Sequence, residues 1–140
     1  MNSITRILML ILTVGCLVVP AVWAQEGCSE ATLAGRWGYT ASGFVTPGPD
    51  SRPIAVSGWF TADGAGTLAG KDVTSLNGLI LHRPFSGTYT VRENCTGTAA
   101  LKFATAITAH LEFTIVAGGS ELTGIGTDLG TVLTGYAKKQ

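Results

Sequence analysis

Charged side chains are scarce in this sequence. Only 13% of the 140 residues are Asp, Glu, Lys or Arg, whereas soluble domains average about 25%. Nine basic residues balance nine acidic ones, and the only adjacent basic pair is Lys138-Lys139 near the end of the chain. Nucleic-acid binding and electrostatic docking to membranes both require a concentrated basic patch. We therefore expect no nucleic-acid partner.

Residues suited to metal binding or acid–base chemistry are scarce as well. The chain has two histidines and three cysteines, all isolated from one another. A metal site needs several such ligands at short spacing, and a serine nucleophile of the hydrolase type needs a G-x-S-x-G turn. The stretch from Gly66 to Lys71 comes near a phosphate-binding loop but is one residue short, and Asp72 stands where Ser or Thr is required. We assign no catalytic residue, no metal ligand and no cofactor.

The one long hydrophobic run lies at the N-terminus, over residues 7–19. It is shorter than the ~20 residues that span a bilayer as a helix, and after it compact residues stand at the two positions that a signal peptidase reads, Val22 and Ala24. This is the pattern of a secretory signal peptide. We predict a signal over 1–24 and a single domain over 25–140, secreted or periplasmic. A lipid anchor on Cys16 is the alternative, disfavoured because the hydrophobic run continues past that cysteine.

Two cysteines remain after the predicted cleavage site. Cys28 and Cys95 lie far apart in the sequence and have no His partners nearby. An even pair in an exported chain favours a disulfide, since such bonds persist in oxidising compartments. We predict that Cys28 and Cys95 are bonded to each other.

The rest of the chain lacks a 3.6-residue hydrophobic period. Short β-branched and aromatic runs alternate with turn residues, which is typical of strands joined by hairpins. Asn77-Gly78 is a strong signal for a two-residue hairpin turn, and Ser29 to Leu33 predicts one helical turn capped by Ser29. The predicted strands cover residues 35–45, 54–61, 67–75, 79–83, 85–91, 96–103, 110–117, 121–127 and 131–138.

These runs predict an all-β fold. Sequential hairpins on a short chain favour a small closed or nearly closed antiparallel up-and-down β-barrel, because closure removes exposed sheet edges. We expect eight or nine strands and one disulfide; Pro84 either ends a strand or sits at a bulge within one. Glycines inside the strands fit strong curvature. A two-sheet sandwich is the alternative fold.

Several stretches resemble a family of small secreted bacterial β-barrel proteins, mostly of unassigned function. The resemblance implies export and an architecture similar to calycins and to allene-oxide-cyclase-type barrels, and it supplies no catalytic residue. The stretches that carry it are Cys28-Ser29-Glu30-Ala31-Thr32-Leu33-Ala34-Gly35 leading into Trp37-Gly38-Tyr39, Phe60-Thr61-Ala62-Asp63-Gly64-Ala65-Gly66, Gly87-Thr88-Tyr89-Thr90-Val91 and Asn94-Cys95-Thr96-Gly97-Thr98.

A second likeness is to lipocalins. Gly35-Arg36-Trp37 is similar to their first-strand G-x-W, whose tryptophan packs at the closed end of the barrel beneath a short helical turn. The resemblance implies a basic side chain from the last strand over that indole, and Lys138 is the candidate for cation–π contact. Trp37 as an ordinary core residue is the other interpretation.

Aromatic and titratable residues on the strands supply candidates for a ligand site. His110 and Glu112 share one strand face, and Leu111, Phe113 and Ile115 share the other. Either the first face lines the barrel lumen as an acid–base pair, or it is solvated and the second face is core, which is the common arrangement in half-buried strands. The full set of candidate ligand-binding residues is Trp37, Tyr39, Trp59, Tyr89, His110 and Glu112.

Three functions compete on this basis. The first is a barrel that binds a small hydrophobic molecule in its mouth or lumen. The second is a structural or interaction protein of the envelope or exterior, which as a homo-oligomer would use its neutral surface for self-association. The third is a cofactor-free cyclase or isomerase, by fold analogy. An outer-membrane barrel is disfavoured because the chain ends in Lys138-Lys139-Gln140 and lacks aromatic girdles. We expect no stable membrane insertion after signal cleavage.

Overall fold

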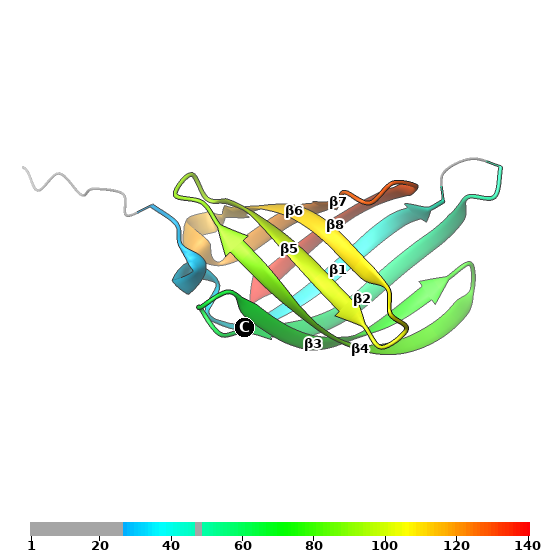
Figure 1. Ribbon diagram of the computed structural model, residues 1–140, viewed down its shortest axis with the longest axis horizontal. Coiled ribbons are helices and arrows are strands. Elements are labelled where there is room, and N and C mark those ends of the chain that lie inside the picture. Colours follow the sequence, from blue (N-terminus) through cyan, green and yellow to red (C-terminus); the bar gives the residue numbers. More distant parts are fainter. Residues whose placement is uncertain (1–26, 47–48) are drawn as a thin grey trace, which may run out of the picture.

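The computed structural model describes residues 27–46 and 49–140. The predicted signal peptide and Cys16 lie outside these residues. Within them, eight antiparallel strands form one closed up-and-down barrel in sequence order, and β8 pairs with β1 to close it (Figure 1). The elements are η1 (Glu30–Leu33), β1 (Gly35–Val45), β2 (Arg52–Ala62), β3 (Thr67–Leu76), β4 (Leu79–Val91), β5 (Thr96–Phe103), β6 (Thr108–Val116), η2 (Ala117–Gly119), β7 (Glu121–Gly126) and β8 (Thr131–Lys139).

The strand predictions are confirmed with one change. Residues 79–83 and 85–91 form a single strand, β4, that runs through Pro84, so the barrel has eight strands. Pro84 pairs with Lys71 of β3, and the ladder to β5 begins one residue later, at Phe85. Proline is tolerated at such a position because a strand paired on one side only can lack an N–H.

The two ends of the barrel differ. We call the end that carries η1 and the turns at 63–66, 92–95 and 117–120 the closed end. We call the opposite end, where the other four connections lie, the mouth (Figure 1). The disulfide between Cys28 and Cys95 joins the segment before η1 to the β4–β5 turn at the closed end, as predicted.

Side chains alternate between the lumen and the outer wall along every strand. The buried hydrophobic cluster belongs to the closed end: Leu33 of η1 packs over inward side chains of the strands. The members of this cluster are Leu33, Trp37, Ala62, Tyr89, Ile115, Leu122 and Ala137. No helix within the described residues is long and apolar enough to cross a bilayer.

Candidate functional site

Trp37, one of the predicted ligand-binding residues, belongs to the packed core of the closed end. Trp37 is completely buried. Its indole N–H donates to the carbonyl of Leu33, at 2.8 Å, and its ring stacks on Phe60 at 6.0 Å between centroids. Lys139 Nζ lies 5.5 Å from the Trp37 ring centroid. The prediction of Lys138 for this contact is therefore wrong by one residue, because Lys138 faces outward.

Tyr89 also belongs to the buried cluster of the closed end. It is buried, and its hydroxyl donates to the carbonyl of Glu30 at 3.2 Å and accepts from the N–H of Gly64 at 3.0 Å. Burial raises the pKa of the Tyr89 phenol. Tyr89 thus ties η1 to the β2–β3 turn.

His110 and Glu112 lie on the outer wall of the barrel, and both are exposed. Leu111, Phe113 and Ile115 face the lumen, so the solvated-face interpretation of this strand is the correct one. His110 Nδ1 lies 2.6 Å from Asp128 Oδ1, and its backbone N–H donates to the same carboxylate at 2.8 Å. The backbone hydrogen bond is the main cause that lowers the pKa of Asp128.

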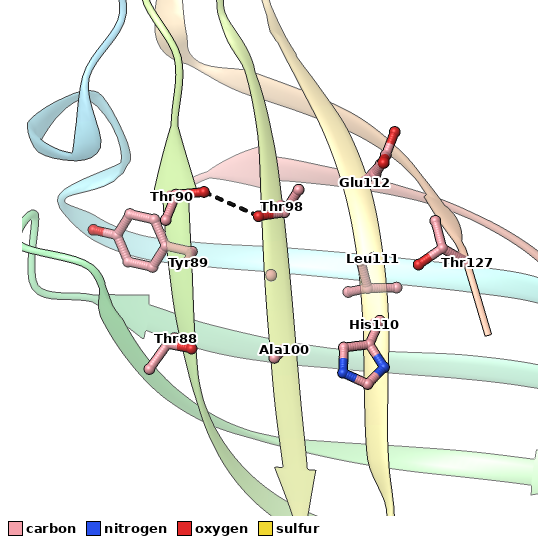
Figure 2. A pocket seen from close by; sticks show the side chains of 10 residues that line it. Thr88, Tyr89, Thr90, Thr98, Ala100, His110, Leu111, Glu112 and Thr127 are labelled. Atoms are coloured by element: carbon pink, nitrogen blue, oxygen red, sulfur yellow. Dashed lines mark hydrogen bonds between the residues drawn. The ribbon is translucent and has the colours of Figure 1, made fainter.

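Two hollows lie on this outer wall. The first, of about 240 Å³, runs across β4, β5 and β6 beside His110 and Glu112 and is bordered by threonines (Figure 2). The second, of about 520 Å³, covers β2, β3 and β4 and includes Trp59 and Lys71. Trp59 lies under the Arg36 guanidinium, at 4.2 Å from carbon to ring centroid. The structure therefore separates Trp59, His110 and Glu112 from the inward residues Trp37, Tyr39 and Tyr89.

Within the lumen, the inward residues form an aromatic series that leads from Trp37 toward the mouth. Phe60 lies 6.0 Å from Tyr39, Tyr39 lies 6.1 Å from Phe85, and Phe85 lies 5.7 Å from Phe103, all between ring centroids. Small inward residues make room for these rings. This series reaches from the closed end to Phe103, the last residue of β5.

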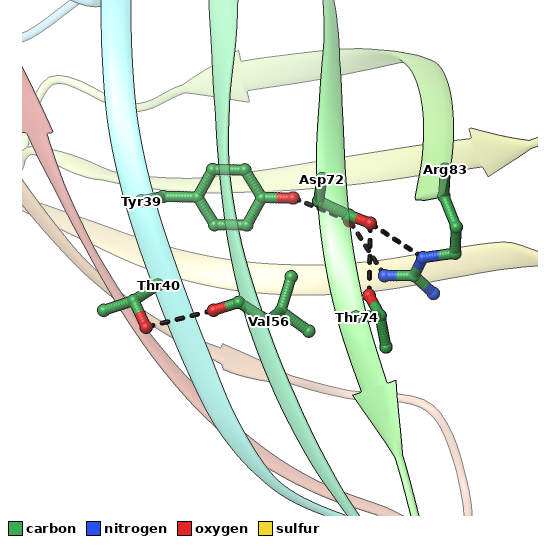
Figure 3. A network of polar contacts seen from close by, with 6 residues as sticks. All are labelled: Tyr39, Thr40, Val56, Asp72, Thr74 and Arg83. Atoms are coloured by element: carbon green, nitrogen blue, oxygen red, sulfur yellow. Dashed lines mark hydrogen bonds and ion pairs between the residues drawn. The ribbon is translucent and has the colours of Figure 1, made fainter. Parts of the chain in front are cut away.

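A charged network adjoins this series, one inward position nearer the mouth than Phe85 on β4 (Figure 3). Asp72 of β3 and Arg83 of β4 are directly opposite each other and face inward. Arg83 donates to both carboxylate oxygens of Asp72, from Nε and Nη2, each at 2.8 Å. The hydroxyl of Tyr39 donates to the same carboxylate at 2.8 Å, and that of Thr74 at 3.1 Å. Burial, and then the charge of Asp72, raises the pKa of Tyr39.

Sequence reasoning missed Asp72 and Arg83. Asp72 and Thr74 are the only buried polar or charged residues in the part of the chain that the structure describes. No group of three or more His, Cys, Asp or Glu residues within 27–46 and 49–140 is placed to hold a metal ion. Neither a family model nor a curated protein matches the chain.

Proposed function

We propose that the protein binds a small apolar molecule in the mouth half of its barrel. The observation that supports this is the difference between the two halves of the lumen. Trp37 at the closed end is 0% exposed, whereas Leu79, which faces inward at the mouth, is 60% exposed. Between these extremes, inward aliphatic residues of the mouth half remain partly exposed. They are Val45, Ile54, Leu76, Leu81 and Leu133.

The rim of the mouth supports the same proposal. Exposed large hydrophobic residues that do not belong to the outer wall of a strand lie on or beside three of the connections at this end, and they are Leu79, Ile107 and Leu129. The turns at the closed end consist of small and polar residues instead, such as Asp63-Gly64-Ala65-Gly66. Covering apolar surface that is exposed to water lowers the free energy, so this surface favours the binding of an apolar ligand.

The test compares two neighbouring positions on β4. Leu81 faces the lumen and Ile80 faces the outer wall. We expect Leu81→Asn to weaken binding of the neutral fluorescent probe N-phenyl-1-naphthylamine by about 10-fold or more, since a buried leucine contributes ~1.5–3 kcal/mol. Ile80→Asn is the matched control and leaves the affinity unchanged. Failure of the probe to bind, or equal losses in both variants, contradicts the proposal.

A second candidate function, self-association, is favoured by one patch of the outer wall. Phe44 of β1 and Val132 of β8 are direct neighbours and both face outward. Ile125 and the fully exposed Leu129 extend this apolar patch toward β7. Sedimentation analysis over a range of concentrations tests it: a dimer that Phe44→Ser with Val132→Ser dissociates supports self-association, and a monomer at every concentration contradicts it.

We also propose that the protein works outside the cytosol. The Cys28–Cys95 bond supports this, because disulfides form and persist in oxidising compartments. Fusion of residues 1–30 to an alkaline phosphatase that is active only after export tests the proposal. Activity that is lost when charged residues interrupt 7–19 is the expected result, and an inactive, cytosolic fusion contradicts it.

A further inference from the structure

We propose that Arg83 is the polar anchor of the bound molecule, and that its pairing with Asp72 selects a neutral hydrogen-bond acceptor, such as the carbonyl of a ketone, ester or lactone, over a carboxylate. This inference rests on the proposed function, since it names the chemical class of the molecule that the mouth binds.

The acceptor capacity of Asp72 is already used. Its side chain is 1% exposed, and each carboxylate oxygen accepts two hydrogen bonds. Oδ1 accepts from Thr74 and from Arg83 Nε, and Oδ2 accepts from Tyr39 and from Arg83 Nη2. A ligand group that must donate a hydrogen bond therefore finds no free acceptor on Asp72.

Arg83, in contrast, keeps donors available. Its side chain is 27% exposed, and no described residue accepts a hydrogen bond from Nη1. Figure 3 shows that the guanidinium presents one edge to Asp72 and turns its third nitrogen away from it. The guanidinium carbon also lies 4.3 Å from the ring centroid of Phe103. The ion pair and the aromatic face hold these free N–H groups in one orientation.

The free N–H groups lie at the base of the partly exposed lumen wall. Moving from Arg83 toward the mouth, the next inward residues on β4 are Leu81 and Leu79, and those on β3 beyond Asp72 are Thr74 and Leu76. An apolar molecule lying against these side chains brings its inner end to Arg83. Binding sites of this kind combine an apolar wall with a few oriented polar groups.

Stability alone gives no reason for an ion pair at this position. Replacing a buried ion pair by apolar residues of similar volume is often neutral or stabilising, and apart from Asp72 and Thr74 the buried side chains of the described residues are hydrophobic. A fully satisfied buried network does fix side-chain orientation. Orientation of Arg83 toward the lumen is what a binding role requires.

The charge balance of the pair decides the chemical class. Asp72 already neutralises Arg83, so a ligand carboxylate would lose its hydration and would lie near a second anion on the same guanidinium. A carbonyl oxygen carries no net charge and loses far less hydration, yet it still accepts from Nη1. The site therefore favours the neutral acceptor.

Three naphthalene probes of nearly equal size test this selection: 2-ethylnaphthalene, 2-acetylnaphthalene and 2-naphthoate, titrated at pH 7 by fluorescence or calorimetry. We expect the ketone to bind about two- to tenfold tighter than the ethyl compound, the usual worth of one net hydrogen bond. We expect 2-naphthoate to bind the most weakly. A carboxylate that binds tightest, or three equal affinities, overturns the inference.

Variants at Asp72 and Arg83 test whether this pair causes the selectivity among the three probes. Asp72→Asn removes the competing anion, so 2-naphthoate becomes the preferred probe. Because this change leaves Arg83 unpaired and can destabilise the fold, Asp72→Leu with Arg83→Met is the second variant; it keeps no charge and no N–H donor on either side chain, and the preference for the ketone over the ethyl compound disappears. Lys102→Met, on the outer wall of β5, is the control for loss of one positive charge and keeps the wild-type order.

The outcomes separate this inference from the proposed function. If 2-ethylnaphthalene binds but the double variant retains the preference for the ketone, Arg83 is not the anchor and only the inference fails. If none of the three probes binds, and N-phenyl-1-naphthylamine does not bind either, the proposed function fails and the inference fails with it.

Discussion

Aromatic side chains inside the barrel lie across glycines of the neighbouring strand. Phe113 of β6 is directly opposite Gly97 of β5, and Phe85 of β4 is opposite Gly70 of β3. A Cβ atom on Gly97 would meet the Phe113 ring at 2.3 Å and the carbonyl oxygen of Thr90 at the same distance. A narrow barrel thus accommodates large rings because adjacent inward positions have no side chain.

This arrangement predicts that a change from glycine to alanine destabilises the barrel at Gly97 but not at Gly38. We expect Gly97→Ala to lower the free energy of unfolding by about 1–3 kcal/mol, the typical cost of overpacking a core. Gly38→Ala is the matched control: Gly38 faces outward on β1, and its added Cβ would meet only the flexible amide of Gln140. Urea unfolding checks both, with unchanged m-values. Equal stability of Gly97→Ala and the parent protein contradicts the packing account.

The hydrogen bonds of Asp63 at the β2–β3 turn predict that the fold loses stability at low pH. Its carboxylate accepts hydrogen bonds from the Thr67 hydroxyl and from the N–H groups of Ala65 and Thr67, and these bonds, the hydroxyl first, lower the pKa of Asp63 to about 2. A lowered folded-state pKa stabilises the fold above the unfolded value of 3.8, and that contribution is lost as pH falls toward 2.

We therefore expect Asp63→Asn to lower Tm at pH 6, and the difference from the parent protein to shrink as pH falls from about 4 to 2. Thermal unfolding followed by circular dichroism at several pH values measures this difference. A difference that stays constant over that range shows that Asp63 acts through geometry alone.

At the residue scale, the sequence could predict the burial of side chains whose chemical type matches a buried environment. Trp37 lies two residues after Gly35 and shortly after a helical turn, and a core position is one of the two interpretations that the sequence supports. Asp72 and Arg83 could not be found this way, because the inward face of β3 reads Leu, Gly, Asp, Thr and Leu, and its outward face is equally mixed. Only the pairing of β3 with β4 reveals that two opposite charges face each other.

At the scale of elements, the turns made the strands predictable. β1 and β5 begin and end where the sequence predicts, because glycine and polar residues flank them. The division of β4 at Pro84 was the one wrong element, since the tolerance of proline depends on where β5 begins to pair. Such non-local pairing is absent from local sequence patterns.

The disulfide and η1 act together on the closed end. Cys28 and Cys95 are 67 residues apart, with Cα atoms 4.8 Å from each other. Cross-linking a loop of this length stabilises a fold by ~4 kcal/mol in the chain-entropy treatment. We expect Cys28→Ala with Cys95→Ala to lose stability up to that size in urea unfolding. The reducing agent that destabilises the parent protein leaves this variant unchanged; a variant as stable as the oxidised parent contradicts the expectation.

At the scale of the whole molecule, the barrel combines a packed end with an open one. The closed end has η1, the disulfide and the buried cluster, so it supplies most of the buried apolar surface. The mouth has partly exposed aliphatic walls and apolar hairpin tips. Barrel closure could be predicted from the sequence, and the G-x-W likeness implied a closed end beneath a helical turn. The partly exposed inward wall at the mouth could not be predicted, because it depends on which inward residues that short cap covers.

The asymmetry predicts unequal stability within a single strand. Residues 79–83 of β4 pair with β3 only, whereas from Phe85 onward β4 also pairs with β5. Figure 1 shows the β3–β4 hairpin reaching beyond the β5–β6 turn at the mouth. Segments with few buried contacts and one-sided pairing open locally at a fraction of the global unfolding free energy.

We therefore expect the hydrogen-bonded amides of residues 79–83 to exchange with solvent through local opening, with rates that barely respond to low urea. Amides of residues 87–91 should exchange only through global unfolding, with a urea dependence that equals the equilibrium m-value. Native-state hydrogen exchange by NMR measures both groups in one sample. If the two groups share one opening free energy, the hairpin is part of the rigid closed-end unit, and ligand entry then requires opening at the β5–β6 or β7–β8 side of the mouth.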